Sequence, residues 1–124
     1  MINRSTETPV HETPIHVQHM SLRWGEMDAL RHLNNVAYFR YFEEARIQWF
    51  RSLGIDYGDD GEGPILGRIE TRFVKPAVYP TDVRVELHVG RIGNSSFVLR
   101  HAMRLESDTS VLFADGEAVM SPPW

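Results

Sequence analysis

Apolar and polar side chains alternate through the second half of the chain with the two-residue period of β-strands. Over residues 83–89 the odd positions are valine or leucine, and the even positions are arginine, glutamate and histidine. Residues 97–105 continue the pattern with apolar odd positions, except for His101. Such alternation predicts strands with one face on a core. A last strand is expected over residues 111–120, with a bulge at Asp115 and Gly116.

Two more strands are expected in the first part of the chain, over residues 15–24 and 65–75. Pro76 and Pro80 end the second of them, because proline has no backbone N–H for a sheet ladder. On the first, alternation places Met20, Leu22 and Trp24 on one face. We therefore expect Trp24 in the core, together with Phe42 and Trp49 from the segment between the two strands, with the lining of an acyl tunnel as the alternative for some of them.

That segment, residues 35–53, has the periodicity of a helix. One side of a helical wheel collects Tyr38, Phe39, Phe42, Ala45, Trp49, Phe50 and Leu53. Asn34 or Asn35 can cap the start, since an amide oxygen accepts from free N–H groups, and Gly54 suits the left-handed residue that ends a helix. Arg46 lies inside the apolar arc, so it is expected to snorkel, to pair with an acid or to face a partner chain.

The predicted order is one strand, one long helix and four more strands. Consecutive strands with short turns make an antiparallel sheet, and the helix is the available cover for its apolar face. We expect an α+β roll of about five strands curled around the helix. Residues 1–14 are polar and rich in proline and threonine, so they are expected to be a flexible tail before a single domain over residues 15–124.

Composition excludes several classes of function. The chain has 124 residues, a net charge of −4 and no cysteine. The charge gives no reason to expect nucleic acid, and the lack of cysteine excludes disulfides, thiolate metal sites and cysteine nucleophiles. No apolar run approaches membrane-spanning length and the N-terminus lacks the apolar centre of a signal peptide, so we expect a cytoplasmic protein that does not bind membranes.

The histidines do not suggest a metal site. His16 and His19 would face opposite sides of one strand, and His88 and His101 belong to different strands. No cysteine or acidic cluster joins them, so no metal is expected.

A polar loop before the helix carries the candidate chemistry. It holds Glu26, Asp28 and His32, and Asn34 and Asn35 follow at the expected helix start. The free N–H groups there can hold a developing negative charge. A carboxylate a few residues ahead of them is a way to build a reactive site, although a loop acid in this place is also a common capping residue.

The same residues carry a family resemblance. The motifs are Asp28-x-x-x-His32-x-Asn34-Asn35-x-x-Tyr38, Phe42-Glu43-Glu44-Ala45-Arg46, Phe73-x-Lys75-Pro76-Ala77 and Ile92-Gly93-x-Ser95-Ser96-Phe97. In this order they resemble the hotdog-fold acyl-CoA thioesterases, above all the 4-hydroxybenzoyl-CoA thioesterase family with its long-chain acyl-CoA thioesterase members. The likeness runs from about residue 17 to residue 120, nearly the whole chain.

The resemblance implies a hotdog fold that works as a homodimer or as a dimer of dimers, with active sites at the subunit interface. It assigns the chemistry to Asp28, and it assigns polarisation of the thioester carbonyl to the backbone N–H near Asn35. A glycine commonly precedes the motif histidine, whereas this chain has Arg31. If that position needs a positive φ, Arg31 costs about 1 kcal/mol or the loop bends differently. A longer C-terminal segment that is often present in the family is missing.

Other motif residues have less specific roles. His32 is expected to orient the loop by hydrogen bonding, with direct proton transfer as the alternative, and Asn34 belongs to the same catalytic block. Tyr38 is expected in the core or in the wall of an acyl pocket. Candidates for binding the coenzyme A phosphates are Lys75, Arg91, Ser95 and Ser96, and the competing interpretation is ordinary surface charge and polar turn residues.

The resulting hypothesis is hydrolysis of an acyl-CoA thioester to a free acid and coenzyme A. Asp28 acts either as nucleophile, through a mixed anhydride, or as a base on water. No cofactor is expected, because coenzyme A is part of the substrate. The alternatives are a non-catalytic module that binds acyl-CoA or an acyl carrier, and a hotdog hydratase, which the spacing of Asp28 and His32 fits poorly.

Overall fold

A computed structural model of the chain describes residues 13–55 and 63–122. Its elements are β1 (His16–Ser21), the 3-10 turn η2 (Trp24–Glu26), α1 (Asn35–Ser52), β2 (Ile65–Phe73), β3 (Asp82–Ile92), β4 (Phe97–Leu105) and β5 (Asp108–Ser121). Most of the expected N-terminal tail, residues 1–12, lies outside the described residues. Within the described ranges, no helix combines the length and the apolar character that crossing a membrane requires.

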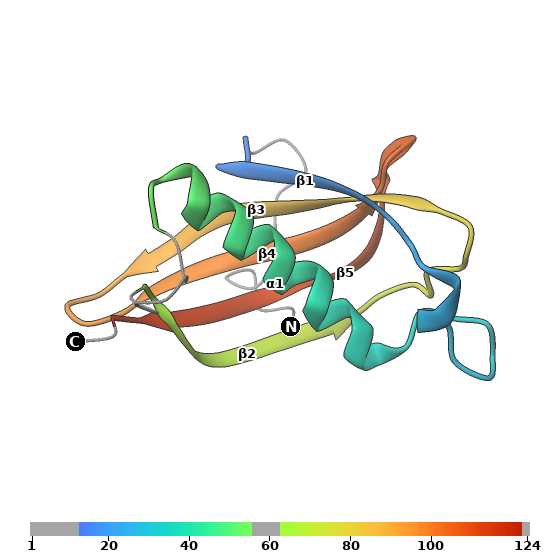
Figure 1. Cartoon of the computed structure of the whole chain (residues 1–124), viewed down its shortest axis with the longest axis horizontal. Helices are drawn as coiled ribbons and strands as arrows, with labels where there is room; N and C mark the ends of the chain where they lie inside the picture. Colours follow the sequence, from blue (N-terminus) through green and yellow to red (C-terminus); the bar gives the residue numbers. More distant parts are fainter. Residues whose placement is uncertain (1–12, 56–62, 123–124) are drawn as a thin grey trace, which may run out of the picture.

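The strands form one five-stranded antiparallel sheet in the order β1-β3-β4-β5-β2. Helix α1 lies across one face of this curved sheet (Figure 1). This confirms the predicted hotdog architecture. The order along the sheet differs from the order along the chain, because β2 and β3 are consecutive in sequence and lie apart in the sheet. The segment 74–81 makes this crossing, and its two prolines suit a segment outside the ladder.

Helix α1 begins and ends where capping residues predict. The Asn34 side chain accepts a hydrogen bond from Val36 N, at 3.0 Å, and this satisfies one of the free N–H groups of the first turn. The helix ends at Ser52, one residue before the predicted limit. Leu53 is its C-cap, and Gly54 follows with a φ of 85°. Leu53 itself is 57% exposed, so the apolar face of the helix stops short of it.

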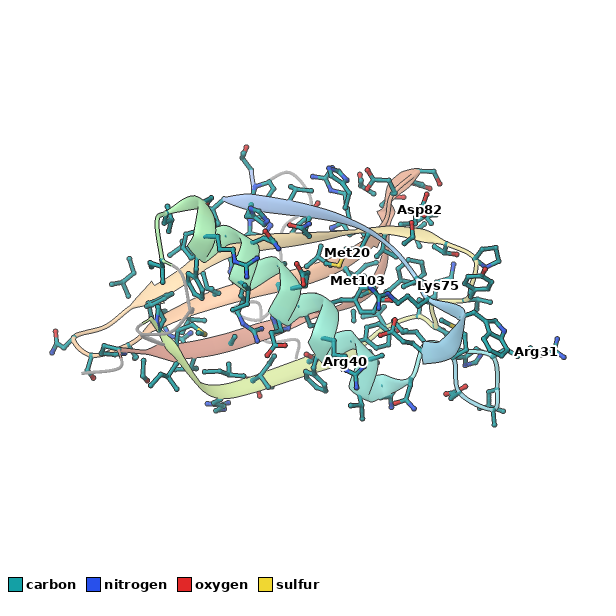
Figure 2. The ribbon with its side chains drawn as sticks, in the orientation of Figure 1. Met20, Arg31, Arg40, Lys75, Asp82 and Met103 are labelled. Atoms are coloured by element: carbon teal, nitrogen blue, oxygen red, sulfur yellow. The ribbon has the colours of Figure 1, made fainter. Side chains whose placement is uncertain are left out.

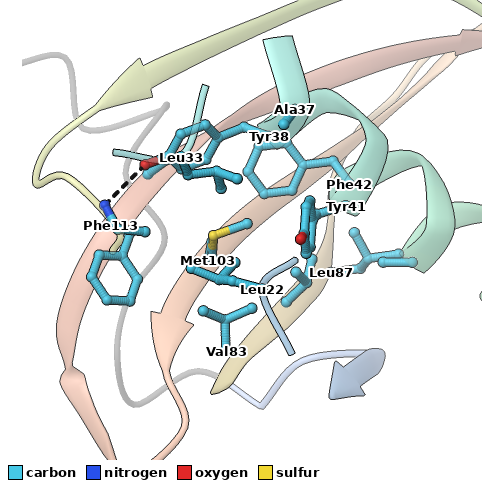
Figure 3. Close-up of a cluster of buried hydrophobic side chains, with 14 residues drawn as sticks. Leu22, Leu33, Ala37, Tyr38, Tyr41, Phe42, Val83, Leu87, Met103 and Phe113 are labelled. Carbon is cyan, nitrogen blue, oxygen red and sulfur yellow. Dashed lines mark hydrogen bonds between the residues drawn. The ribbon is translucent and has the colours of Figure 1, made fainter. Parts of the chain in front are cut away.

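The core lies between α1 and the sheet. Figure 3 shows Tyr38, Tyr41 and Phe42 from the helix above Met103 and Val83 from the sheet. Phe42 is completely buried, as predicted, while Trp49 is half-buried against this cluster. Tyr41, which the wheel leaves outside the apolar face, is buried as well.

Two predictions about the strands are wrong. Strand β1 ends at Ser21, and Trp24 turns outward in η2 with 75% of its surface exposed, so it is not a core residue. The bulge expected at Asp115 and Gly116 is absent from the described ladder, since Gly116 pairs in register with both His101 and Thr71. Register shifts occur instead in β2 between Leu66 and Arg68, near the end of β3, and in the β4–β5 ladder between Met103 and Leu105.

Candidate active site

The loop before α1 is closed by hydrogen bonds to Asp28. Its carboxylate oxygen Oδ1 accepts from Leu30 N at 2.9 Å and from His32 N at 3.1 Å. Its backbone N–H donates to the His32 carbonyl at 2.7 Å. A bridge between Met27 and Leu33 brings the two ends of the loop together. The Asp28 carboxylate is therefore held by its own loop.

Arg31 stands at the tip of this loop with a φ of 64°. Of the two outcomes left open by the sequence, the structure has the positive φ. A left-handed conformation costs an arginine about 1 kcal/mol, because its Cβ crowds the backbone. The hydrogen bond from Arg31 N to the Asp28 carbonyl, at 2.9 Å, helps to hold the turn.

Most of the backbone N–H groups at the start of α1 donate hydrogen bonds. Leu33 N donates to the Ala77 carbonyl at 2.8 Å, and Asn34 N donates to the Glu26 carbonyl at 2.9 Å. Val36 N is taken by the Asn34 side chain. For the N–H of Asn35, the described part of the chain offers no acceptor. This donor lies at the positive end of α1, where a developing negative charge is stabilised.

Glu26 has a structural partner. Tyr41 donates its hydroxyl hydrogen to Glu26 Oε1, and the same hydroxyl oxygen accepts from Arg23 N at 3.3 Å. Burial and the hydrogen bond to Glu26 raise the pKa of Tyr41 to about 12. The phenol is thus protonated, and Glu26 serves to fix the helix against the loop.

Tyr38 is a buried wall beside the loop. It is 2% exposed, its ring packs edge-on against Phe73 at 5.1 Å, and its hydroxyl accepts from Ala77 N at 3.4 Å (Figure 3). Burial raises the pKa of Tyr38, and the negative charge of Asp28 acts in the same direction. Tyr38 therefore stays neutral and belongs to the core, one of the two places expected for it.

Asp28 opens onto a cavity of about 640 Å³. The lining residues are Trp24, Gly25, Met27, Asp28, Arg31 and Tyr79. A second cleft of about 570 Å³ lies between β1 and α1 and contains Arg23, Glu26 and Tyr41. Sequence reasoning found Asp28 and named the lining of a tunnel as the alternative place for Trp24, but it missed Tyr79.

The four residues predicted to bind phosphates do not meet in one protomer. Lys75 follows β2 and lies toward the same end of the molecule as Arg31, as Figure 2 shows. Arg91 belongs to the last residues of β3, and Ser95 and Ser96 lie in the β3–β4 turn, at the opposite end of the sheet (Figure 1). The structure therefore brings only Lys75 toward the end that carries Asp28.

The described residues contain no group of three or more His, Cys, Asp or Glu side chains that could hold a metal ion. His88 and His101 lie on neighbouring strands but face opposite sides of the sheet, since paired positions share a face and His101 pairs with Leu87.

Comparison with known proteins places this fold and loop in a family. Residues 22–121 match the profile of the thioesterase-like superfamily. The PA2801 protein of Pseudomonas aeruginosa, provisionally named a thioesterase, is similar, with 40% identity and a TM-score of 0.84 over 88% of this chain and 84% of that one. A Xanthomonas campestris protein, provisionally named an acyl-CoA thioesterase, is 33% identical, with a TM-score of 0.81 over 89% and 93%.

A more distant likeness is to YsmA of Bacillus subtilis, which is 27% identical over 82 residues. That match covers 66% of this chain and 56% of YsmA, so the chain spans little more than half of that relative. The profile match over most of the chain and the two structures at 40% and 33% identity agree with the architecture. The chain therefore belongs to the thioesterase-like superfamily, and it is a thioester hydrolase with the hotdog fold.

Proposed function

We propose that the protein hydrolyses acyl-CoA thioesters and that Asp28 is the reacting carboxylate. The observation that carries this proposal is the position of Asp28, which lines the 640 Å³ cavity in the loop that leads into α1. Similarity to a protein named for acyl-CoA hydrolysis supports the choice of substrate class.

The hydrogen bonds of Asp28 suit this role. Oδ1 accepts from two backbone N–H groups, which fixes the carboxylate, while Oδ2 has no hydrogen-bond partner among the described residues. Oδ2 can attack the carbonyl carbon, which expels the coenzyme A thiolate and leaves a mixed anhydride for water to cleave. Alternatively it takes a proton from a water molecule that attacks the same carbon.

The thioester oxygen becomes negative in either route. We place it against the Asn35 N–H, which is not engaged by the described residues. Such a donor is typically worth about 3–4 kcal/mol in the transition state. Asn34 caps the helix that presents this N–H, and His32 donates its backbone N–H to Asp28, so both act as positioning residues.

We further propose that two copies pair through β2. This strand is an edge of the sheet, and an edge strand presents unpaired N–H and C=O groups. Apolar side chains are exposed along and beside it, including Ile65, Phe73 and Val74. Antiparallel pairing sets the start of one β2 beside the end of the other. The β3–β4 turn of one copy, with Arg91, Ser95 and Ser96, then points toward the same end of the assembly as Asp28 of the other copy.

The substitution Asp28→Asn tests the proposal. Asparagine keeps Oδ1 as an acceptor for Leu30 N and His32 N, so the loop and the unfolding temperature should change little. Loss of the nucleophile or base should lower kcat by about 10²-fold or more while KM changes much less. Turnover is followed through release of the free thiol, over acyl-CoAs of several lengths and one aryl-CoA.

Glu26→Gln is the matched control, because glutamine keeps an acceptor for the Tyr41 hydroxyl and removes a neighbouring negative charge. It should cost far less activity than Asp28→Asn. Near-normal turnover in Asp28→Asn would remove the mechanism. Binding of acyl-CoA without turnover in the unmodified protein would instead identify a non-catalytic binding module.

A further inference from the structure

Arg31 occupies a backbone conformation that glycine would adopt at no steric cost. Its φ of 64° is the one positive value for a non-glycine residue in the described chain. Strained backbone of this kind concentrates at functional sites, where the side chain supplies something that a less strained residue could not. We infer that Arg31 binds a negatively charged group on the acyl portion of the substrate. This inference rests on the proposed acyl-CoA hydrolysis at Asp28.

The position of Arg31 selects the acyl portion rather than the nucleotide. Arg31 and Asp28 line the same cavity, and the backbone N–H of Arg31 bonds to the carbonyl of Asp28. The Arg31 side chain therefore starts from the same turn that holds the reacting carboxylate, and it extends outward from the tip of the loop (Figure 2). In coenzyme A the long pantetheine arm separates the phosphates from the thioester. A group that reaches Arg31 while the thioester carbon is at Asp28 must then belong to the acyl side.

The charges around the cavity favour an anionic acyl group only if Arg31 is present. Asp28 repels a second carboxylate, and the other lining side chains, Trp24, Met27 and Tyr79, carry no positive charge. Arg31 is exposed and forms no ion pair with any described residue, so its guanidinium is available. A planar guanidinium binds a carboxylate through two parallel hydrogen bonds. The aromatic walls exclude water on binding and strengthen that pair.

A pair of substrates tests this inference. Glutaryl thioester carries a terminal carboxylate, and pentanoyl thioester is its uncharged counterpart of equal chain length. Both are prepared on coenzyme A and on N-acetylcysteamine, which lacks the phosphates. The variants are Arg31→Gly, which relieves the backbone, and Arg31→Asn, which tolerates the left-handed region. Arg51→Gln, an exposed arginine in the last turn of α1, is the charge control.

We expect both Arg31 variants to lose about tenfold or more in kcat/KM for glutaryl thioester, on either carrier, and to stay within about twofold for pentanoyl thioester. Arg51→Gln should leave the ratio of the two substrates unchanged. Equal losses for both acyl groups, or no loss, would overturn the inference. A loss seen on coenzyme A alone would also overturn it and would assign Arg31 to a phosphate.

A binding measurement separates this result from the fate of the catalytic proposal. Calorimetry in an Asp28→Asn background should show that loss of Arg31 weakens glutaryl-CoA and spares pentanoyl-CoA. That selectivity is independent of turnover. If the unmodified protein binds both thioesters and hydrolyses neither, the proposed function fails while the selectivity still decides the role of Arg31.

Discussion

At the scale of single residues, His101 departs most from the alternation that defines its strand. It faces α1, is completely buried, and stacks on Phe42 with ring centroids 3.9 Å apart. Its Nε2 lies 3.2 Å from Thr71 Oγ1. Burial and the positive charge of Arg46 lower the pKa of His101 to about 3. A neutral ring is therefore the stable form in the folded protein at neutral pH.

This predicts a loss of stability in mild acid. An unfolded histidine binds a proton near pH 6.5, and the folded one resists it down to about pH 3, so the unfolded state holds more protons between these values. The contribution of His101 is present above pH 6.5 and is lost as the pH falls, by roughly 1 kcal/mol per pH unit. Urea unfolding from pH 7 to pH 4 measures this slope.

In the variant His101→Gln the slope should be shallower, whatever its stability at pH 7. His19→Gln is the control, because His19 is exposed and pairs only with Glu106 among the described residues. An unchanged slope in His101→Gln would show that other groups account for the acid sensitivity.

The sequence was informative about residues whose role is local. The cap at Asn34 follows from a short motif, and the departure from glycine at Arg31 raised the possibility of a positive φ; the structure has both features. It was less informative where distant segments decide burial. Tyr41 is buried because Glu26 receives its hydroxyl, and Trp24 is exposed because the strand before it ends early. The hydrophobic periodicity around these two residues predicts neither the burial of Tyr41 nor the exposure of Trp24.

At the scale of elements, Gly116 sets how closely β2 approaches β5. A Cβ at this position would lie 2.0 Å from the carbonyl oxygen of Glu70 and 2.9 Å from Thr71 Cα, both backbone atoms. The glycine predicted to make a bulge instead allows close packing at a part of the ladder that is in register. The sequence predicted five strands, but it could not show that β2 pairs with β5, because each strand alone fits either neighbour.

Gly116→Ala should therefore be strongly destabilising. Backbone cannot move aside as a flexible side chain can, so we expect a loss of about 3 kcal/mol or more in the free energy of unfolding. Chemical denaturation measures it. Gly93→Ala is the control, since its nearest neighbour would be 3.5 Å away, and it should stay within about 0.5 kcal/mol. Similar stability in the two variants would contradict the close approach of β2 to Gly116.

At the scale of the whole molecule, the charges on β2 favour pairing with a second copy. Arg68, Glu70 and Arg72 point to one face of the strand and alternate in sign. An antiparallel pair with its two-fold axis at Ile69 sets Arg68 of each copy opposite Glu70 of the other. Opposite charges across such a pair are favourable and like charges are not.

We predict that sedimentation at micromolar concentration gives at least twice the chain mass of 14.3 kDa. Glu70→Arg should raise the dissociation constant of the dimer by about tenfold. The substituted side chain of each copy then lies opposite Arg68 of the other copy, which makes two like-charge pairs. The double variant Arg68→Glu with Glu70→Arg restores opposite charges and should recover the assembly. A species of one chain mass in the unmodified protein would rule out the pairing, and failure of the double variant to recover would rule out this register.

The two edges of the sheet are unequal, and this sets a limit on growth. β2 has nine residues, whereas β1 at the other edge has six, most of them polar. A sheet whose two edge strands can both pair with another copy can extend indefinitely and form a fibre. In the proposed dimer, self-pairing of β2 occupies the longer edge of both copies and leaves only the short, polar β1 strands at the outer edges. The backbone groups that bind the first neighbour are then no longer available, so this mode of pairing predicts an assembly that stops at two copies along the sheet.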